Sequence, residues 1–414
     1  MKKLIQGYVN IPLILKILVG LIIGAVLGLF VPQAGFVATF GTIFVSALKA
    51  IAPILVFVLI TASLASAGDG IGGRFRTVIM LYMLTTFLAA VLAVVASFIF
   101  PTAIPLTGVE SATNAAPSGL SEVFGTLFNN MVQNPLTAMQ TGNYIGILTW
   151  AIVFGIALRG LASDNTKNML SDLSGAVSKA VAWVIQLAPF GIMGLIYSTV
   201  NEYGMEIFVD YGKLLVLLVG CMLLVALVIN PLLAGFLLKR NPYPLLFKCL
   251  RESGLTAFFT RSSAANIPVN MSLCEKLGLS RDYYSVAIPL GATINMDGAA
   301  ITITVMSLAA AFSMGIEVNI FSAIILSFIS TLGACGASGV AGGSLLLIPM
   351  ACSLLGVDPE IAMQVVGVGF IIGVVQDSVE TALNSSGDAY FAAVAEYHDL
   401  RKKGEPMPFY DNKK

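Results

Sequence analysis

Charged residues are scarce in this sequence, and histidine is almost absent. Only 11% of its 414 residues are charged and the formal net charge is +0, whereas a soluble domain carries about a quarter charged residues. This balance gives no basis for nucleic-acid binding, so we expect no nucleic-acid partner. The only histidine, His398, lies in what we interpret as a polar tail, and the five cysteines contain no CxxC pair. We therefore expect no metal site of the histidine–cysteine kind, no disulfide framework and no covalent cofactor.

Long apolar stretches are abundant instead. The sequence is 57% hydrophobic, with a mean hydropathy of +0.91. A helix needs about 20 apolar residues to cross a bilayer, and the short alternating segments of a membrane barrel are missing. The sequence therefore predicts an all-α polytopic membrane protein, in which the first span is a retained helix and not a signal peptide. The plain spans are expected near 11–31, 42–67, 77–101, 143–160, 174–200 and 213–238.

Lysine and arginine are unevenly distributed among the connecting segments. They occur at the N-terminus, in the loops near 74–76, 159–167 and 239–240, and in the tail. The alternate connectors carry almost none, and the longest, 101–141, has no lysine or arginine. Because positive residues favour the cytoplasmic side, we expect both termini to be cytoplasmic.

The second half of the chain is irregular. Segments 243–280, centred on FFTRSSAANIPVN, and 318–356, centred on GACGASGVAGGS, have small or polar middles between apolar arms. This pattern favours two re-entrant helical hairpins, which the flanking charges orient oppositely, each followed by a helix with an Asn–Asp–Gly cluster. Opposed hairpin–helix units are typical of an inverted repeat with a binding site at the bilayer midplane. The alternative for the glycines is close helix packing of the GxxxG type.

The run QDSVETALNSSGD carries a polar stripe. Helical geometry places Asp377, Glu380, Thr381, Asn384 and Asp388 on one face. A solvated helix face, with Glu380 near an aqueous end, is the alternative, although the apolar run GVGFIIGVV precedes the stripe.

Charge at membrane depth is unbalanced in this half. One positive residue, Arg261, stands against four carboxylates, those of Asp297, Asp377, Glu380 and Asp388. An unpaired excess of this kind is costly in an apolar interior. Protonation could relieve part of it, but carboxylate, amide and carbonyl oxygens are also the ligands that a small hard cation prefers. We therefore expect bound cations, with sodium as the coupling ion.

Three polar residues of the third span share one face. Tyr82, Thr85 and Thr86 are spaced i, i+3 and i+4. They could contribute to a cation site, or they could satisfy one another inside the helix bundle.

Several motifs together resemble one family. TRSSAANIPV, PLGATINMDGA, the glycine-rich second hairpin and the D-x-x-E-T-x-x-N-x-x-x-D helix are similar to those of the dicarboxylate/amino acid:cation symporters, the glutamate-transporter family, and specifically of its bacterial serine/threonine:sodium branch. The resemblance covers nearly the whole chain. It implies eight transmembrane helices plus two opposed re-entrant hairpins, inverted repeats, an elevator-type mechanism, a homotrimer surrounded by lipid, and location in the bacterial inner membrane.

The resemblance also implies a division of the chain into a static scaffold and a moving transport domain. The expected parts are scaffold helices 1 and 2 in 1–75, transport helix 3 in 76–101, an extracellular connector with scaffold helices 4 and 5 in 102–205, transport helix 6 in 206–240, a transport core of both hairpins and the last two helices in 241–400, and a cytoplasmic tail in 401–414.

Binding residues follow from the same resemblance. The substrate ammonium is expected at Asp377, beside Arg261, and the substrate carboxylate at Ser263, Asn384 and the second hairpin. The full implied substrate set is Arg261, Ser262, Ser263, Val340, Gly342, Gly343, Asp377, Glu380, Thr381 and Asn384. The resemblance implies three sodium sites. The first is formed by Asp388 with the carbonyls of Gly291, Asn295 and Asn384, and the second by Thr293 with hairpin backbone near 334–337. The third is formed by Tyr82, Thr85, Thr86, Asn295 and Asp297.

Departures from the family pattern bear on the substrate. Glu380 stands where members that transport acidic substrates have arginine, whose planar fork suits a side-chain carboxylate. A glutamate would repel acidic substrates and could accept a hydrogen bond from a small hydroxyl, so we expect import of serine and threonine. Acidic amino acids or dicarboxylates, coupled to sodium or protons, and anion conduction are the alternatives. Ala264, Ala299, Ala337 and Ala341 also differ from the family pattern and leave the second cation site and the stoichiometry open.

An intramembrane protease is a further alternative. Residues 336–339 read Gly-Ala-Ser-Gly, but a serine protease of this kind needs a histidine in another span. With His398 as the only histidine, we expect no enzyme activity.

Overall fold

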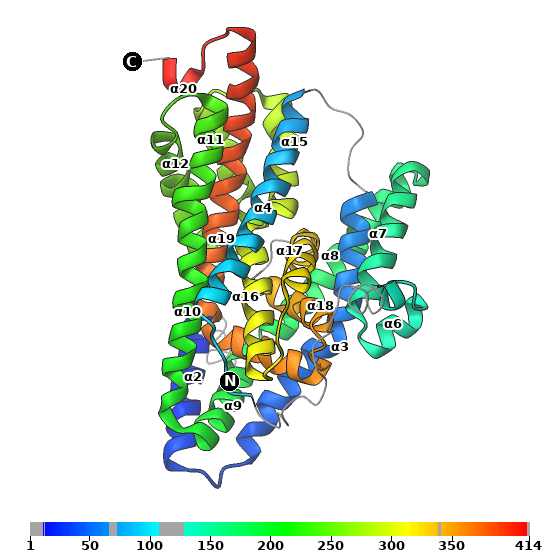
Figure 1. Cartoon of the computed structure of the whole chain (residues 1–414), viewed down its shortest axis with the longest axis vertical. Coiled ribbons are helices and arrows are strands. Elements are labelled where there is room, and N and C mark those ends of the chain that lie inside the picture. Colours follow the sequence, from blue (N-terminus) through cyan, green and yellow to red (C-terminus); the bar gives the residue numbers. More distant parts are fainter. Residues whose placement is uncertain (1–10, 12, 66–72, 107–127, 338–340, 412–414) are drawn as a thin grey trace.

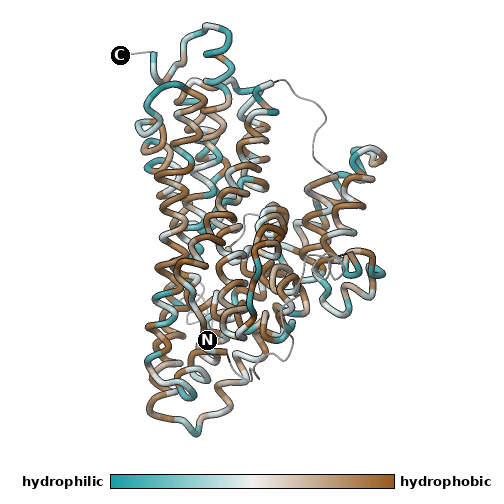
Figure 2. Tube along the Cα trace, in the orientation of Figure 1, coloured by the Kyte–Doolittle hydropathy of each residue, from teal (hydrophilic) through white to brown (hydrophobic). Residues whose placement is uncertain are grey.

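The computed structural model describes residues 11, 13–65, 73–106, 128–337 and 341–411, and every regular element that these residues form is a helix (Figure 1). Six of the helical stretches are long and apolar enough to cross a membrane. The prediction of an all-α polytopic membrane protein is confirmed at this level, while the number of eight spans stays a prediction. Large apolar side chains such as Phe30, Val216 and Phe236 are more than 70% exposed on the single chain, which suits contact with lipid. Figure 2 shows hydrophobic residues along most of the tall bundle and hydrophilic residues at the end of the bundle where the C-terminus of the chain lies.

One group of helices packs around α3 and α9. This group comprises α2 (Leu13–Phe30), α3 (Phe36–Ala65), α7 (Tyr144–Leu161), α8 (Asp164–Ile185) and α9 (Ala188–Tyr203), with the short α6 (Pro135–Thr141) beside α7. Gly20, Gly24 and Gly28 form one ridge of α2, and a Cβ atom at any of them would collide with backbone carbonyl oxygens of α9. Small residues at this spacing let the two helix backbones approach closely.

The predicted span 174–200 is wrong. Helix α8 ends at Ile185 and α9 begins at Ala188, with Pro189 in its first turn. Proline is compatible with a helix start but not with a helix interior. The sequence predicted one span here because the apolar run continues across the end of one helix and the start of the next.

The second group includes the tall bundle in Figure 1. It contains α4 (Gly73–Ile99), α10 (Ile207–Leu224) and α11 (Asn230–Leu238), joined by the π-helix η2 (Val225–Ile229), and all later elements. Both predicted hairpin segments contain a helix, a turn and a returning helix. The first consists of α12 (Tyr243–Cys249), η3 (Leu250–Gly254), α13 (Leu255–Thr260) and α14 (Ser263–Lys276); the second consists of α17 (Ile320–Ala334), η4 (Ser344–Leu347) and α18 (Ile348–Leu354). That they are re-entrant and opposed stays a prediction.

Helix α19 (Pro359–Lys403) packs against both hairpins and against α4, α15 (Arg281–Ile294) and α16 (Asp297–Ser313). Its 45 residues span about 68 Å at 1.5 Å per residue, roughly twice the thickness of a hydrocarbon core. The helix therefore includes His398, whose Nδ1 lies 3.1 Å from the carbonyl oxygen of Leu237. His398 therefore lies in this helix and not in a separate tail, and among the described residues the helix is followed by the short α20 (Pro408–Asp411).

The helix after the first hairpin is interrupted. It consists of α15 (Arg281–Ile294) and α16 (Asp297–Ser313), and Asn295 and Met296 between them have non-helical backbone angles. Non-helical backbone at membrane depth is tolerated where it is buried in protein or lines a site. Both residues are buried, and the break faces α4 and α19.

Candidate functional site

The polar stripe of α19 faces the protein interior. Asp377, Glu380, Thr381, Asn384 and Asp388 are each at most 5% exposed, so the alternative of a solvated helix face is wrong. Because α16 packs against both α4 and α19, the break at 295–296 lies among the polar residues of three helices.

Asp297 begins α16 and is fully buried. Its Oδ1 accepts a hydrogen bond from Thr86 Oγ1 at 3.2 Å, and its Oδ2 accepts one from Asn230 Nδ2 at 3.1 Å. The positive end of the α16 dipole also favours a carboxylate here. Among the described residues, dipoles and not a cationic side chain therefore surround Asp297.

The three polar residues of α4 have different partners. Thr86 contacts Asp297 and also accepts the backbone N–H of Met296 at 3.2 Å. Tyr82 donates its hydroxyl to the carbonyl oxygen of Asp388 at 3.0 Å. Thr85 donates to carbonyl oxygens of its own helix. The structure thus brings Tyr82 and Thr86 to the two aspartates. Thr85 also lies beside Asp297, while its hydroxyl bonds within its own helix, as in the alternative of satisfaction inside the bundle.

Asp388 lies on the other side of the break. Its Oδ1 accepts Asn295 Nδ2 at 3.0 Å, and Asn295 Nδ2 also contacts the carbonyl oxygen of Asn384 at 2.9 Å. Asp388 Oδ2 and Asn295 Oδ1 are buried without a hydrogen-bond donor among the described residues. Gly291 is required here, because a Cβ atom would lie 2.9 Å from both Asp388 Oδ1 and the hydroxyl of Tyr82.

Asn384 fixes the start of α16. Its Oδ1 accepts the backbone N–H of Gly298 at 2.8 Å, and its Nδ2 lies 3.5 Å from the sulfur of Met296. The carbonyl oxygen of Gly291 accepts the N–H of Asn295 at 2.9 Å. These bonds hold the carbonyl groups of the break in one arrangement.

Thr293 bonds to its own helix, α15. Its hydroxyl donates to the carbonyl oxygen of Leu290 at 2.7 Å. The sulfur of Cys335 lies 3.7 Å from the carbonyl oxygen of Ile294, so the tip of the second hairpin lies beside the end of α15. The predicted pairing of Thr293 with this tip stays a prediction.

Asp377 joins the two hairpin tips. Arg261 Nε lies 2.6 Å from Asp377 Oδ2, and the backbone N–H of Gly342 donates to Oδ1 at 3.2 Å. Arg261 ends α13 with a φ of 52°. Ser262 caps α14 by accepting the N–H of Ala265, and Ser263 is buried in the first turn of that helix.

The other predicted substrate residues lie along this face. Thr381 donates to the carbonyl oxygen of Asp377 at 2.7 Å, and Gly343 is buried next to Gly342. Val340 lies outside the described residues.

Glu380 is surrounded by neutral hydrogen-bond donors. Its Oε2 accepts bonds from Thr302 Oγ1 at 2.6 Å, Ser344 Oγ at 3.0 Å and Gln376 Nε2 at 2.5 Å. Gly298 allows this approach, because a Cβ atom there would lie 2.9 Å from the Cα of Glu380. The site is therefore lined by hydroxyl and amide groups at the position where a guanidinium would suit an acidic substrate.

Sequence reasoning missed Asn230, Thr302, Ser344 and Gln376. Gln376 lies one turn from Glu380, and this spacing could have revealed it. Thr302 and Ser344 carried no such signal, and Asn230 stood out only as a polar residue before a proline in an apolar run.

The oxygen atoms at the break fit a small hard cation. In the part of the chain that the structure describes, no three histidine, cysteine, aspartate or glutamate side chains come together as a metal site. Instead, one carboxylate on each side of the break is combined with amide, hydroxyl and carbonyl oxygens. Asp388 Oδ2, Asn295 Oδ1 and Asn230 Oδ1 are buried and meet no donor from the described residues, which is unfavourable unless a positive partner faces them. Sodium and calcium prefer such oxygens.

One protein-family model matches almost the whole chain. The model of the sodium:dicarboxylate symporter family matches residues 13–397. The chain belongs to that family. As a member of the sodium:dicarboxylate symporter family the chain is a transporter, which confirms the expectation that it is not an enzyme.

Relatives within the family are similar over almost their full length. The chain is 58% identical over 412 residues to a serine/threonine transporter SstT of Bifidobacterium adolescentis, covering 99% of this chain and 96% of the relative. It is 53% identical over 402 residues to a serine/threonine transporter SstT of Streptococcus thermophilus, covering 97% of this chain and all of the relative. The predicted serine/threonine branch of the symporter family is thereby confirmed.

Proposed function

We propose that the protein is a sodium-coupled symporter that imports L-serine and L-threonine. The observation that carries this proposal is the pair of buried carboxylates, Asp297 and Asp388, on the two sides of a helix break where the amide oxygens of Asn230 and Asn295 meet no donor among the described residues. A cation with a gradient across the membrane would compensate these groups and drive transport. The names of the relatives support the choice of substrate.

The environment of Glu380 supports a small neutral substrate. The side-chain carboxylate of an aspartate or glutamate substrate would lie beside the buried carboxylate of Glu380, where two like charges are costly. The buried Arg261, which could otherwise attract an acidic side chain, is already paired with Asp377. A substrate hydroxyl could instead join the hydroxyls of Thr302 and Ser344 around Glu380.

Asp377 is proposed to bind the substrate ammonium. Its Oδ1 accepts one N–H at 3.2 Å from Gly342 in the second hairpin. Movement of that hairpin would break this single neutral bond and expose Oδ1, while Arg261 would still pair with Oδ2. Ser263 and Asn384, with Val340, Gly342 and Gly343 of the hairpin tip, would then bind the substrate carboxylate.

The larger-scale mechanism is proposed from the family. The α2–α3–α7–α8–α9 group would be the static scaffold of a homotrimer in the inner membrane, and the tall bundle would move as an elevator. Both termini would be cytoplasmic, and the second hairpin would be the extracellular gate. The contacts of α19 with both hairpins support their movement as one body.

Purified protein in liposomes tests the proposal. An inward sodium gradient should drive accumulation of labelled serine, and the same gradient of potassium should not. Excess threonine should compete with serine, while aspartate should not. Serine or anion flux that does not depend on sodium would contradict the proposal and favour a channel; competition by aspartate would favour transport of acidic amino acids.

A further inference from the structure

Asn230 lies where a membrane helix loses its regular hydrogen bonding. It directly follows the π-helix Val225–Ile229 and precedes Pro231. Proline has no N–H to donate to Leu227, and the carbonyl oxygen of Leu227 instead accepts the hydroxyl of Tyr243 at 3.1 Å. Short π-helical turns of this kind are frequent at functional sites.

The side chain of Asn230 points at Asp297. Its Nδ2 lies 3.1 Å from Asp297 Oδ2, and the residue is 2% exposed. Its Oδ1 has no donor among the described residues. Because Oδ1 and Nδ2 are bonded to the same carbon atom, this oxygen lies beside the same carboxylate.

A buried amide next to a carboxylate can serve in two ways. In the present arrangement its N–H donates to Asp297 and partly compensates the negative charge. A half-turn of the amide about its terminal bond exchanges Nδ2 and Oδ1, and the oxygen then faces the region in which the carboxylate attracts a cation. The exchange needs no backbone movement, since the two ends of an amide have nearly the same shape.

We propose that Asn230 is a direct ligand of the cation held at Asp297, with its amide donating to the carboxylate when the ion is absent and presenting Oδ1 when the ion is bound. This inference rests on the proposed sodium coupling. It adds a ligand from α11 to a site that otherwise draws on α4 and on the α15–α16 break. The competing explanation is that Asn230 only positions Asp297 through its N–H.

Two substitutions separate these roles. Asn230→Leu removes both the donor and the oxygen, whereas Asn230→Asp removes the donor but keeps an oxygen at the same place. A direct ligand predicts that Asn230→Leu raises the sodium concentration for half-maximal stabilisation by roughly tenfold or more, while Asn230→Asp leaves it unchanged or lowers it. A purely positioning role predicts that both variants weaken sodium binding alike.

The measurement uses full-length protein in detergent without substrate. The melting temperature is followed while sodium chloride replaces choline chloride at constant ionic strength. Asn270→Leu is the matched control, because Asn270 is also a fully buried amide with an oxygen that lacks a donor, but it contacts Ser385 and not Asp297. If Asn230→Leu does not fold, Asn230→Ala, which only removes atoms, replaces it.

The outcomes distinguish this inference from the proposed function. Equal weakening by both Asn230 variants, or no change in either, would overturn the ligand role. Asp297→Asn serves as the reference: if it weakens sodium binding while the Asn230 variants do not, only the inference fails. If Asp297→Asn also leaves the titration unchanged, the cation site itself is wrong.

Discussion

Arg261 Nε and Asp377 Oδ2 lie 2.6 Å apart, and their side chains are only 10% and 3% exposed. The pair links the tip of the first hairpin to α19, and Gly342 links the second hairpin to the same carboxylate. Arg261 adopts the left-handed conformation, which costs a non-glycine residue about 1–2 kcal/mol. The ion pair is thus the contact that offsets a strained turn.

Loss of one member of this pair should be more harmful than loss of both. Arg261→Met leaves the Asp377 carboxylate buried without its cation, and breaking a buried pair in this way costs about 3–5 kcal/mol. The double variant Arg261→Met/Asp377→Asn should recover much of that stability, although it should not transport serine. Melting temperatures in detergent measure the effect, with Arg251→Met, at an exposed position of the same hairpin, as the control. A double variant no more stable than Arg261→Met would contradict the role assigned to the pair.

Asp388→Asn should weaken the response to sodium. The carboxylate has one buried oxygen without a donor, and an amide cannot supply the negative charge that compensates a cation. We expect the apparent sodium affinity for serine uptake to fall at least tenfold, since losing such a contribution of about 1.4 kcal/mol or more has that effect. Sodium titration by calorimetry provides a second measurement. An unchanged dissociation constant would remove Asp388 from the set of ligands.

Glu380→Gln should reduce the preference for substrates with a hydroxyl. Hydrogen bonds to charged groups contribute about 1 kcal/mol more than neutral ones, so the preference for serine over alanine should fall roughly fivefold. Competition of labelled serine uptake by unlabelled alanine gives the ratio. Glu360→Gln is the control, because Glu360 lies on the same helix with its side chain 82% exposed. Unchanged selectivity would show that Glu380 does not line the substrate pocket.

The buried polar face of α19 could be predicted from the sequence, but the interruption that it faces could not. The face follows from helical periodicity alone, and α19 has no proline beyond its first turn. The break at 295–296 instead depends on partners far away in sequence. The N–H of Met296 donates to Thr86, 210 residues away, and the N–H of Gly298 donates to Asn384, 86 residues away. A local pattern cannot reveal that such acceptors replace the helical ones.

Asn230 illustrates the same limit. Its partner Asp297 is 67 residues away, and the π-helix that positions it has an entirely apolar sequence, VALVI. An asparagine before a proline could equally have ended the helix. The family motifs pointed to most of the other residues that the structure brings to the break, but they gave no indication of a contribution from α11.

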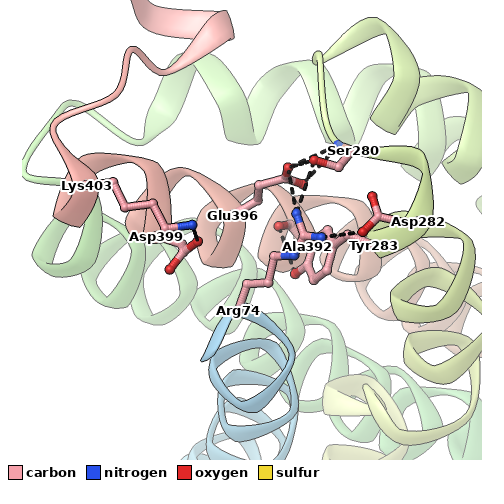
Figure 3. A network of polar contacts seen from close by, with 8 residues as sticks. All are labelled: Arg74, Ser280, Asp282, Tyr283, Ala392, Glu396, Asp399 and Lys403. Atoms are coloured by element: carbon pink, nitrogen blue, oxygen red, sulfur yellow. Dashed lines mark hydrogen bonds and ion pairs between the residues drawn. The ribbon is translucent and has the colours of Figure 1, made fainter. Parts of the chain in front are cut away.

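A network at one end of the tall bundle should be important for stability (Figure 3). Glu396 is 4% exposed and accepts bonds from the hydroxyl of Ser280 at 2.5 Å and its N–H at 3.0 Å, with Arg74 at 3.4 Å. Glu396→Gln should lower the free energy of unfolding by about 1.5–3 kcal/mol, the range for hydrogen bonds to a charged group. Asp399→Asn, in the more exposed pair with Lys403 on the same helix, should change it by less than about 0.5 kcal/mol. Equal losses in the two variants would contradict this distinction.

A fall in pH should lower the stability of the first hairpin where Glu252 links its two arms. Glu252 in η3 lies 2.9 Å from Lys248 Nζ and 3.1 Å from Lys276 Nζ, and so links the two arms. The hydrogen bond from Lys248, with a further contribution from Lys276, lowers the pKa of Glu252 below its usual value of 4.5.

A carboxylate whose pKa is lowered by folding stabilises the protein fully above its unfolded pKa and loses this contribution as the pH falls through the folded value. The melting temperatures of the wild type and Glu252→Gln should therefore differ at pH 7 and converge as the pH falls below about 4.5. Glu275→Gln, an exposed residue of the same hairpin, should show no such convergence. A difference for Glu252→Gln that persists at pH 3 would mean that the lysine contacts do not stabilise the hairpin through the ionised carboxylate.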